Sequence, residues 1–239
     1  MINEEYQFHN LLSYRTLAHG ISSKKFGSMK KNESDVDREK LATFAKSVGI
    51  TDEIVCMRQI HSGNVRIVSN ASDLRIPETD ALITNKKHVP LAVMTADCLP
   101  LVFYDPKNEV MGVAHAGYKG LLNDVIAHTI QRFIADFSSD PQDIIVGIGP
   151  AIEMMCYEVN EERIAAFDKA FPTCKNSSAQ IGGKYFLNLQ EVAQQCLIKE
   201  GILKEHIEIK NICTKCDKNF FSYRRGDTFE RFISVVSLV

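Results

Sequence analysis

The chain has 239 residues, of which 45% are hydrophobic and 24% charged, and its 28 Lys and Arg nearly balance its 30 Asp and Glu. A chain of this length and apolar content can bury a sizeable core, and a net charge of −2 is not that of a general nucleic-acid or membrane-surface binder. The first ten residues have no apolar signal-peptide core, and no run of about 18 apolar residues could span a bilayer. Seven widely spread cysteines are typical of free thiols in a reducing compartment. We therefore expect a cytoplasmic protein with no membrane and no nucleic-acid partner, and the length suits one large domain or two small ones.

The first predicted elements are a helix and a series of strands. The polar stretch 22–40 predicts a loop that runs into a helix beginning near Asp35 and ending at Gly49. Strand-like runs at 55–61 and 65–69 are joined by Ser62-Gly63-Asn64, which predicts a hairpin turn. Further apolar, β-branched or aromatic runs predict strands at 80–84, 91–95, 99–104 and 110–114. Residues 55–115 are thus expected to form a sheet.

The second half of the chain mixes helices and strands. Gly117 and Gly120 open a run of apolar residues at helical spacing, which predicts one helix as far as residue 137. Asn188, with Glu191 three residues later, is typical of a capping box and predicts a helix that Gly201 ends. The remaining patterns predict a helix near 160–170 and strands at 143–148, 206–213, 220–224 and 232–239. Strands and helices so interspersed indicate an α/β or α+β fold with a mixed sheet.

Three residues are candidate metal ligands or catalytic groups: His61, Cys98 and His115. Each stands at or just beyond the end of a predicted strand, where side chains from distant segments can converge on one cleft. Two imidazoles and a thiolate suit zinc, with a fourth position left for water or substrate. Without a metal, Cys98 and a histidine could form a nucleophilic pair. Spacing alone also allows Cys98 to be a small core residue.

The residues beside these candidates could bind an anion or move a proton. Asp97 could orient a histidine, accept a proton or cap the following turn. The helix that begins near Gly120 would point its positive end toward His115, and Lys119 adds charge, so phosphate could bind there. Arg224, in Tyr223-Arg224-Arg225, could also bind an anion, or could simply be solvated at a strand end.

Cys213 and Cys216 form a Cys-x-x-Cys pair. A zinc ribbon needs a second such pair, which the sequence lacks. A thioredoxin-type motif opens a helix, whereas the residues after Cys216 have an extended pattern. Neither function is favoured. The run Gly147-Ile148-Gly149-Pro150 lacks the third glycine of a dinucleotide fingerprint and indicates a tight turn.

Six motifs, in order along the chain, resemble those of one family. They are Gln59-Ile60-His61-Ser62, TDALIT at 79–84, TADCLP at 95–100, GVAHAG at 112–117, GPAI at 149–152 with YEV at 157–159, and CT at 213–214 with FFSYRR at 220–225. The family is the bacterial purine nucleoside phosphorylase group formerly called multicopper polyphenol oxidase or laccase-domain proteins, and it includes the peptidoglycan editing factor proteins. The resemblance covers residues 55–239 well and the first 50 weakly.

The resemblance implies a fold, a cofactor and a reaction. The fold is α/β, with mixed β-sheets packed together and helices on the outside, layered α/β/β/α, in one domain, residues 1–239. The zinc ligands fall on His61, Cys98 and His115, and copper is less favoured because a multicopper site needs many more ligands than seven scattered histidines supply. The implied reactions are phosphorolysis of adenosine, inosine and methylthioadenosine, and deamination of adenosine. The partners are then a purine nucleoside and phosphate, with Lys119 and Arg224 as expected phosphate ligands and Asp97 as expected proton carrier.

The sequence departs from the family pattern at three places, and two other functions stay open. Ser62 and Glu230 stand where the family usually has Gly, and Tyr118-Lys119 replaces Trp-Arg. Lys keeps the charge of Arg but loses its bidentate fork, so these changes bear on substrate preference more than on the metal. The alternatives are a cysteine or zinc hydrolase that edits a peptidoglycan precursor, and a non-catalytic zinc- and nucleotide-binding protein.

Overall fold

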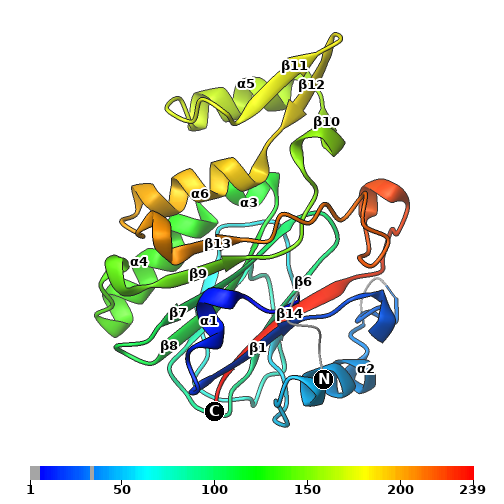
Figure 1. Cartoon of the computed structure of the whole chain (residues 1–239). Coiled ribbons are helices and arrows are strands. Elements are labelled where there is room, and N and C mark those ends of the chain that lie inside the picture. The colour runs from blue at the N-terminus through cyan, green and yellow to red at the C-terminus, as the bar shows by residue number, and fades with distance from the viewer. Residues whose placement is uncertain (1–5, 33–34) are drawn as a thin grey trace.

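The computed structural model describes residues 6–32 and 35–239 (Figure 1). The first five residues of the N-terminal segment, and residues 33–34 of the polar stretch before the first predicted helix, lie outside the described residues. The helices are α1 (His9–Leu12), α2 (Arg38–Ser47), α3 (Tyr118–Leu122), α4 (Val125–Phe137), α5 (Glu161–Ala170) and α6 (Leu189–Lys199). The strands are β1 (Leu17–Ile21), β2 (Cys56–Met57), β3 (Val65–Ile67), β4 (Arg75–Ile76), β5 (Ala81–Thr84), β6 (Leu91–Thr95), β7 (Leu99–Asp105), β8 (Val110–Ala116), β9 (Ile145–Ile148), β10 (Glu158–Val159), β11 (Ser178–Ile181), β12 (Lys184–Leu187), β13 (Ile207–Ile209) and β14 (Phe232–Leu238).

Two sheets form the body of the molecule. The larger sheet has six strands in the order β13-β9-β7-β8-β5-β3, and the second has three in the order β1-β14-β6. The pairs β13/β9 and β3/β5 are parallel, whereas the other pairs in these two sheets are antiparallel. The mixed sheet expected from the alternation of strands and helices is therefore confirmed.

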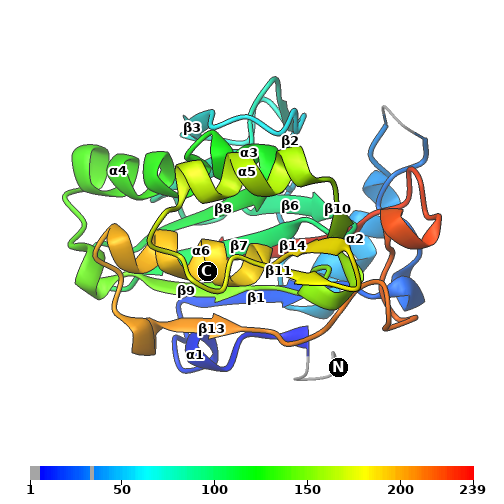
Figure 2. The same cartoon turned by 90° about the horizontal axis from the view of Figure 1, so that it is seen from above.

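Side-chain alternation along the strands stacks the two sheets between helices. In β7, Leu101 and Phe103 pack against α4 and α6, while Val102 and Tyr104 face the second sheet. In β14, Val235 and its neighbours on the same face pack against α2 instead. The order of layers is helices, six-stranded sheet, three-stranded sheet, helix, as Figures 1 and 2 show. The α/β/β/α layering is confirmed, and the prediction that residues 1–239 form a single domain stays a prediction.

The predicted hairpin between 55–61 and 65–69 is wrong. Strand β2 pairs with β4, and β3 pairs with β5, so the two runs are not partners. The reason is that the backbone N–H groups of Ile60, His61 and Ser62 donate to the carboxylate of Asp80 and not to a facing strand. Residues 58–64 form a loop wound around that carboxylate.

The predicted helix from Gly120 to residue 137 is two helices. Helix α3 ends at Leu122, and α4 begins at Val125. Asp124 between them has a φ of 55°, a left-handed conformation that interrupts the helical hydrogen bonds. The apolar spacing survives the break, which is why periodicity did not reveal it.

Other predictions met mixed outcomes. The helices near 160–170 and from Asn188 are confirmed as α5 and α6, and the side chain of Asn188 accepts a hydrogen bond from the backbone N–H of Glu191 at 3.2 Å. The predicted strand at 220–224 is instead a loop that ends in the 3-10 helix η6 (Tyr223–Arg225). Within the described residues, no helix is long and apolar enough to cross a membrane.

A hairpin that the sequence did not predict projects from the body. Strands β11 and β12 are joined at Gly182 and Gly183, whose φ angles of 58° and 77° suit glycine. With β10 they make a small third sheet, which lies beside α5 at the top of Figure 1 and away from the two main sheets.

Candidate metal centre and cleft

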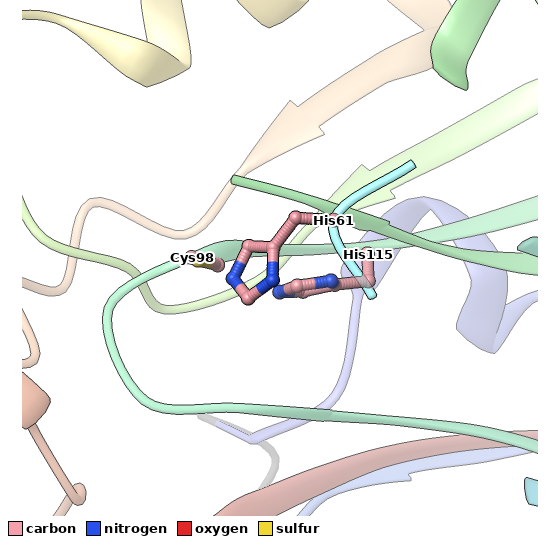
Figure 3. A group of neighbouring side chains, drawn as sticks. All are labelled: His61, Cys98 and His115. Atoms are coloured by element: carbon pink, nitrogen blue, oxygen red, sulfur yellow. The ribbon is translucent and has the colours of Figure 1, made fainter. Parts of the chain in front are cut away.

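The three predicted ligands come together although they are far apart in the chain. Cys98 immediately precedes β7 and His115 lies in β8; because Leu99 pairs with Ala116 across these antiparallel strands, the two side chains become neighbours. His61 reaches the same place from the loop after β2 (Figure 3). One ligand atom from each residue lies within 4.8 Å of the other two, and the two imidazole rings are 4.8 Å apart between centroids.

This donor set fits zinc. Around a tetrahedral zinc, bond lengths of about 2.0–2.3 Å place nitrogen and sulfur donors about 3.3–3.6 Å apart. Donor atoms within 4.8 Å of one another can reach that spacing through small side-chain rotations. Three protein donors leave a fourth position open, as in catalytic rather than structural zinc sites. His61 is exposed, so the open side faces solvent and any bound molecule.

Asp80 is a fully buried carboxylate that organises two of the three ligands. Its Oδ1 lies 2.9 Å from Nδ1 of His115 and accepts the backbone N–H of His61 at 3.0 Å. Its Oδ2 accepts the backbone N–H and the hydroxyl of Ser62, both at 2.7 Å, and the N–H of Ile60 at 3.2 Å. One carboxylate therefore folds the His61 loop and leaves Nε2 of His115 to face the centre, in the manner of carboxylate–histidine–metal triads.

Sequence reasoning missed Asp80. The residue stands at the start of the TDALIT motif, directly before β5, and its type and position carry no obvious sign of burial. The signal available was an acidic residue inside an otherwise apolar motif, because a buried carboxylate needs several hydrogen-bond donors or a cation. Ser62, where the family usually has Gly, supplies two of those donors in this chain.

The charges at the centre perturb one another's pKa values. Burial alone would raise the pKa of Asp80, but the hydrogen bond and charge of His115 and the donors of Ser62 lower it to about 2. Burial also works against the Cys98 thiolate, yet His115 and His61 lower the pKa of that thiol to about 6. Burial disfavours the His115 cation, but Cys98 and Asp80 raise its pKa to about 9. A ready thiolate is the form of cysteine that binds metals or attacks electrophiles.

Gly117 and Gln59 shape the surroundings of the three candidate ligands. A Cβ atom placed on Gly117 would lie 2.7 Å from Sγ of Cys98 and 3.2 Å from Cδ2 of His61, so glycine is required at the end of the GVAHAG motif. Gln59 anchors the His61 loop from the other side: its side chain donates to the carbonyl of Met94 at 2.8 Å and accepts from the N–H of Met94 at 3.1 Å. The Gln59 side chain thereby pairs with the end of β6 through two hydrogen bonds, as the backbone of a neighbouring strand would.

A cleft of about 580 Å³ opens beside the three ligands. That volume is within the range of small-molecule sites. Its walls combine aromatic, apolar and cationic side chains; besides the ligands and Asp97 they include Tyr118, Tyr157, Tyr223, Met57, Met94, Arg58, Arg163, Arg224 and Arg231. Aromatic faces next to arginines suit a ligand with a flat apolar part and an anionic part.

Asp97 lines the cleft but its carboxylate is already engaged. Oδ1 accepts the hydroxyl of Thr214 at 2.7 Å, and Oδ2 accepts the backbone N–H of Arg224 at 2.7 Å. Its φ of 94° is unusual for a residue other than glycine, and these two bonds hold it there. The carboxylate that contacts a histidine of the candidate centre is that of Asp80. Asp97 ties the turn before Cys98 to the C-terminal segment.

The two predicted phosphate ligands differ in position. Arg224 lines the cleft, with its guanidinium 4.9 Å from the ring centroid of Tyr157 and a hydrogen bond to the carbonyl of Glu158 at 2.7 Å. Lys119 is exposed on α3, 6.0 Å from the ring centroid of Tyr118. Because α3 has only five residues, the helix-dipole argument for an anion beside Lys119 does not hold.

Arg163 is a cation of the cleft that sequence reasoning missed. From α5 it stacks on Tyr118 with 3.8 Å between the guanidinium and the ring centroid, and it donates to the Tyr157 hydroxyl at 3.2 Å. Nothing near position 163 marks it as a site residue, since α5 reads as an ordinary amphipathic helix and reaches the cleft only through the tertiary fold.

The layered body, with its convergent donors beside a cleft, defines an α/β protein with a candidate metal centre. A model of the family described as multi-copper polyphenol oxidoreductase laccase matches residues 14–239. The purine nucleoside phosphorylase YlmD of Bacillus subtilis is 31% identical over 232 residues, covering 90% of this chain and 83% of YlmD. A purine nucleoside phosphorylase of Clostridium acetobutylicum is 35% identical over 185 residues, covering 75% of each chain.

Solved structures show the same architecture. The hypothetical protein YfiH of Bacillus licheniformis is 28% identical, covers 93% of each chain and has a TM-score of 0.87. YlmD of Geobacillus stearothermophilus is 26% identical, with a TM-score of 0.82. The chain belongs to the multi-copper polyphenol oxidoreductase laccase family, which confirms the resemblance carried by the six motifs and extends it toward the N-terminus.

Proposed function

We propose that the chain is a cytoplasmic, zinc-dependent purine nucleoside phosphorylase that acts on adenosine, inosine and S-methyl-5′-thioadenosine and also deaminates adenosine. The observation that carries the proposal is the open cluster of His61, Cys98 and His115 on the wall of a cleft whose other walls are aromatic and cationic. Relatives named purine nucleoside phosphorylase support this reading.

The cleft offers distinct surfaces for the parts of a nucleoside. Tyr118 and Tyr157 give flat faces on which a purine can stack, and Met94 adds apolar surface beside them. The exposed Tyr223 lies at the same cleft and can cover a bound base. The arginines of the cleft can bind phosphate or the ribose hydroxyl groups.

Phosphate is the nucleophile in the proposed phosphorolysis. One of its oxygens forms a bond to the ribose anomeric carbon as the glycosidic bond to the purine nitrogen breaks, and the purine leaves with a proton. Arg163 and Arg224 both line the cleft and can hold phosphate in line for that attack. Lys119, exposed on α3, is proposed to add only longer-range attraction for the anion.

When bound, zinc would act as a Lewis acid and lower the pKa of a water or polarise a substrate oxygen. The chain's own residues prepare the site for it. Asp80 fixes the orientation of His115 and of the His61 loop. Asp97 holds Arg224 through its backbone N–H, so we propose that Asp97 acts mainly by positioning. A proton-carrying role in deamination would require it to release Thr214.

Product analysis tests the proposal. Zinc-loaded protein is incubated with adenosine in the presence and in the absence of phosphate. Phosphorolysis should give adenine and ribose 1-phosphate only with phosphate, whereas deamination should give inosine in both cases. The variant His115→Ala should lose both activities, and Arg224→Ala should lose mainly the first. If wild type makes no more adenine, ribose 1-phosphate or inosine than His115→Ala, the chain is not this enzyme.

Inosine and methylthioadenosine are tested in the same way, with hypoxanthine and adenine as the expected bases. Arg132→Ala is the matched control for Arg224→Ala, since Arg132 forms only an exposed ion pair with Asp136 on α4. Its activity should equal that of wild type. Calorimetry with adenosine separates a non-catalytic zinc- and nucleotide-binding protein, which would bind with heat exchange and yield no product.

A second candidate function rests on the Cys98 thiolate. His115 and His61 lower the pKa of Cys98 to about 6 against the effect of burial, which favours a nucleophilic cysteine in metal-free protein. The corresponding activity is hydrolysis of a peptidoglycan precursor. Full hydrolase activity in chelator-treated protein, abolished by alkylation of Cys98, would support this function. A strict requirement for zinc would count against it.

A further inference from the structure

Three cysteines that lie outside both the candidate centre and the lining of the cleft come together, and one of them, Cys156, directly precedes the cleft residue Tyr157. Cys156 ends the 3-10 helix η4 (Met154–Cys156), while Cys213 and Cys216 lie in the turn that follows β13. Their sulfur atoms lie within 4.8 Å of one another, and those of Cys156 and Cys216 are 3.2 Å apart. All three are free thiols. We call this group the thiol cluster.

The backbone of the turn is directed at the first sulfur of the Cys-x-x-Cys pair. The N–H groups of Glu153, Lys215 and Cys216 donate to Cys213 and, although burial opposes them, lower the pKa of its thiol. The carbonyl of Cys213 accepts the N–H of Cys216 at 3.1 Å and that of Asp217 at 2.8 Å, which closes the turn. Amide donors around one thiolate stabilise it as a ligand before any cation arrives.

The cluster is held together by contacts that do not involve sulfur. Ala151 and Cys213 form a parallel β-bridge, and the N–H of Thr214 donates to the carbonyl of Ala151 at 3.0 Å. The Arg225 guanidinium donates to the carbonyl of Thr214 at 2.7 Å and to those of Lys215 and Asp217 at 3.1 Å each. It also pairs with the carboxylate of Asp227 at 2.9 Å. Both segments are thus fixed in the geometry that brings their thiols together.

The spacing of the sulfurs suits one small cation. Around a tetrahedral zinc with Zn–S bonds of about 2.3 Å, sulfurs lie about 3.8 Å apart. The cluster's 3.2 Å contact and 4.8 Å upper limit bracket that value. An all-sulfur donor set favours soft, thiophilic ions over magnesium or calcium. Cys216 is exposed, so a water can complete the coordination.

A divalent cation bound here would take the place of the protons on these sulfurs. Oxidation to a disulfide is the competing fate of such close thiols.

We propose that Cys156, Cys213 and Cys216 form a second metal site that binds one Zn²⁺, independently of the centre at His61, Cys98 and His115. Zinc there would cross-link the segment before Tyr157 to the turn that carries Thr214. Tyr157 lines the cleft and Thr214 holds Asp97, so the second zinc would act as a structural staple for one wall of the cleft. On binding, each protonated thiol gives its proton to solvent, and no oxidation is involved.

Metal stoichiometry tests the proposal without measuring activity. The protein is stripped with a chelator under a thiol reductant, reloaded with Zn²⁺, freed of excess metal and analysed for zinc and free thiols. Wild type should bind about two equivalents, one for each cluster. Cys216→Ser and His61→Ala should each bind about one, and the double variant almost none. Both side chains are exposed, so these substitutions spare the core.

A spectroscopic arm identifies the donors. With Cd²⁺ in place of zinc, the ultraviolet thiolate-to-metal band should persist in His61→Ala and fall sharply in Cys216→Ser. The matched control is Cys196→Ser, since Cys196 lies on α6 away from the cluster and should leave two equivalents bound. One equivalent in fully reduced wild type that Cys216→Ser retains, or two in Cys216→Ser, overturns the proposal, whereas one equivalent that Cys216→Ser loses and His61→Ala keeps counts against the first centre instead. A Cys156–Cys216 disulfide that forms in air despite saturating Zn²⁺ also overturns it, in favour of a redox pair.

Discussion

The two groups of candidate metal-ligating side chains in this molecule are built on opposite principles. The centre at His61, Cys98 and His115 belongs to the sheet body, and a buried carboxylate, Asp80, holds it from behind. The thiol cluster belongs to two loops, and backbone amides together with Arg225 hold it. At the first centre the carboxylate of Asp80 supports the imidazole of His115. At the thiol cluster, backbone amide dipoles and the guanidinium of Arg225 lie near the cysteines.

The difference in donors matches a difference in purpose. Two nitrogens and one sulfur beside a cleft leave an open position where a substrate can bind, which suits catalysis. Three sulfurs outside the cleft lining favour tight retention of a soft ion and little chemistry. The comparison teaches that two groups of three candidate ligands in one fold can suit different functions, because the donor atoms and the supporting residues differ.

The largest expected effect concerns Asp80→Asn, which removes the support peculiar to the first centre. An amide cannot accept from both Ser62 donors while also pairing with the His115 cation. We expect unfolding to become easier by about 3–5 kcal/mol and zinc affinity at this centre to fall about 10–100-fold. Urea denaturation and zinc titration measure the two quantities.

The control for that substitution is Asp143→Asn, because the pair of the half-buried Asp143 with the exposed Lys107 should be worth about 1 kcal/mol or less. Zinc retention at the thiol cluster in Asp80→Asn would sharpen the contrast between the groups. An Asp80→Asn protein with unchanged urea midpoint and zinc affinity would remove Asp80 from its organising role.

Acid should affect the sheet body through His19. Burial lowers the pKa of His19 to about 4, and its Nε2 accepts the backbone N–H of Phe8 at 2.9 Å. Between pH 6.5 and pH 4 the unfolded chain takes up a proton at this residue that the folded chain does not, so stability falls as pH falls. The loss from this one group is about 3 kcal/mol.

His19→Gln tests that assignment, since glutamine can still accept the Phe8 N–H but does not titrate. Urea midpoints at pH 7, 5.5 and 4 should fall less steeply for the variant than for wild type. His88→Gln is the matched control, because His88 is exposed and pairs only at the surface with Asp52. Parallel pH profiles of wild type and His19→Gln would show that other groups carry the acid response.

A purely steric change should break the first centre alone. In Gly117→Ala the new methyl group would sit 2.7 Å from the Cys98 sulfur, so the thiol or the turn must move. We expect a cost of about 2 kcal/mol in stability and at least a tenfold loss of zinc affinity at this centre. Gly120→Ala is the control in the same turn, since its nearest contact is the His115 carbonyl at 3.2 Å. Equal zinc binding by both variants would contradict the steric explanation.

The smallest expected effect tests the support of the thiol cluster. Arg225→Lys replaces a fork that reaches several carbonyls with a single ammonium group. We expect a loss of about 1 kcal/mol in stability and weaker zinc binding at the thiol cluster with the first centre unchanged. Thermal melts with and without zinc measure both, with Arg132→Lys on the surface of α4 as control. Loss of zinc from the first centre instead would reverse the assignment.

The sequence predicted well what depends on local chemistry. Asn188 and Glu191 revealed the start of α6, because a cap is a short-range interaction. The apolar runs revealed β6, β7 and β8, since strands buried on both faces must be apolar throughout. The metal-ligand hypothesis came from residue types at strand ends, and the ordered motifs of a known family strengthened it.

What the sequence did not predict depends on contacts between distant segments. Asp80 acts through residues about twenty positions before it and thirty-five after it, and no periodic pattern encodes such a contact. Arg163 reaches Tyr118 only because α5 lies over the cleft. Cys156 joins Cys213 and Cys216 from 60 residues away, so the Cys-x-x-Cys pair alone looked incomplete.

The hairpin of β11 and β12 has a practical consequence for work on this protein. Its turn at Gly182 and Gly183 is exposed, and no atom would obstruct a Cβ at either glycine. The residues of the turn lie outside the lining of the cleft and both ligand clusters. A fluorescent label, an affinity tag or a whole inserted domain can therefore be carried at this point, because loop tips with small residues tolerate insertion.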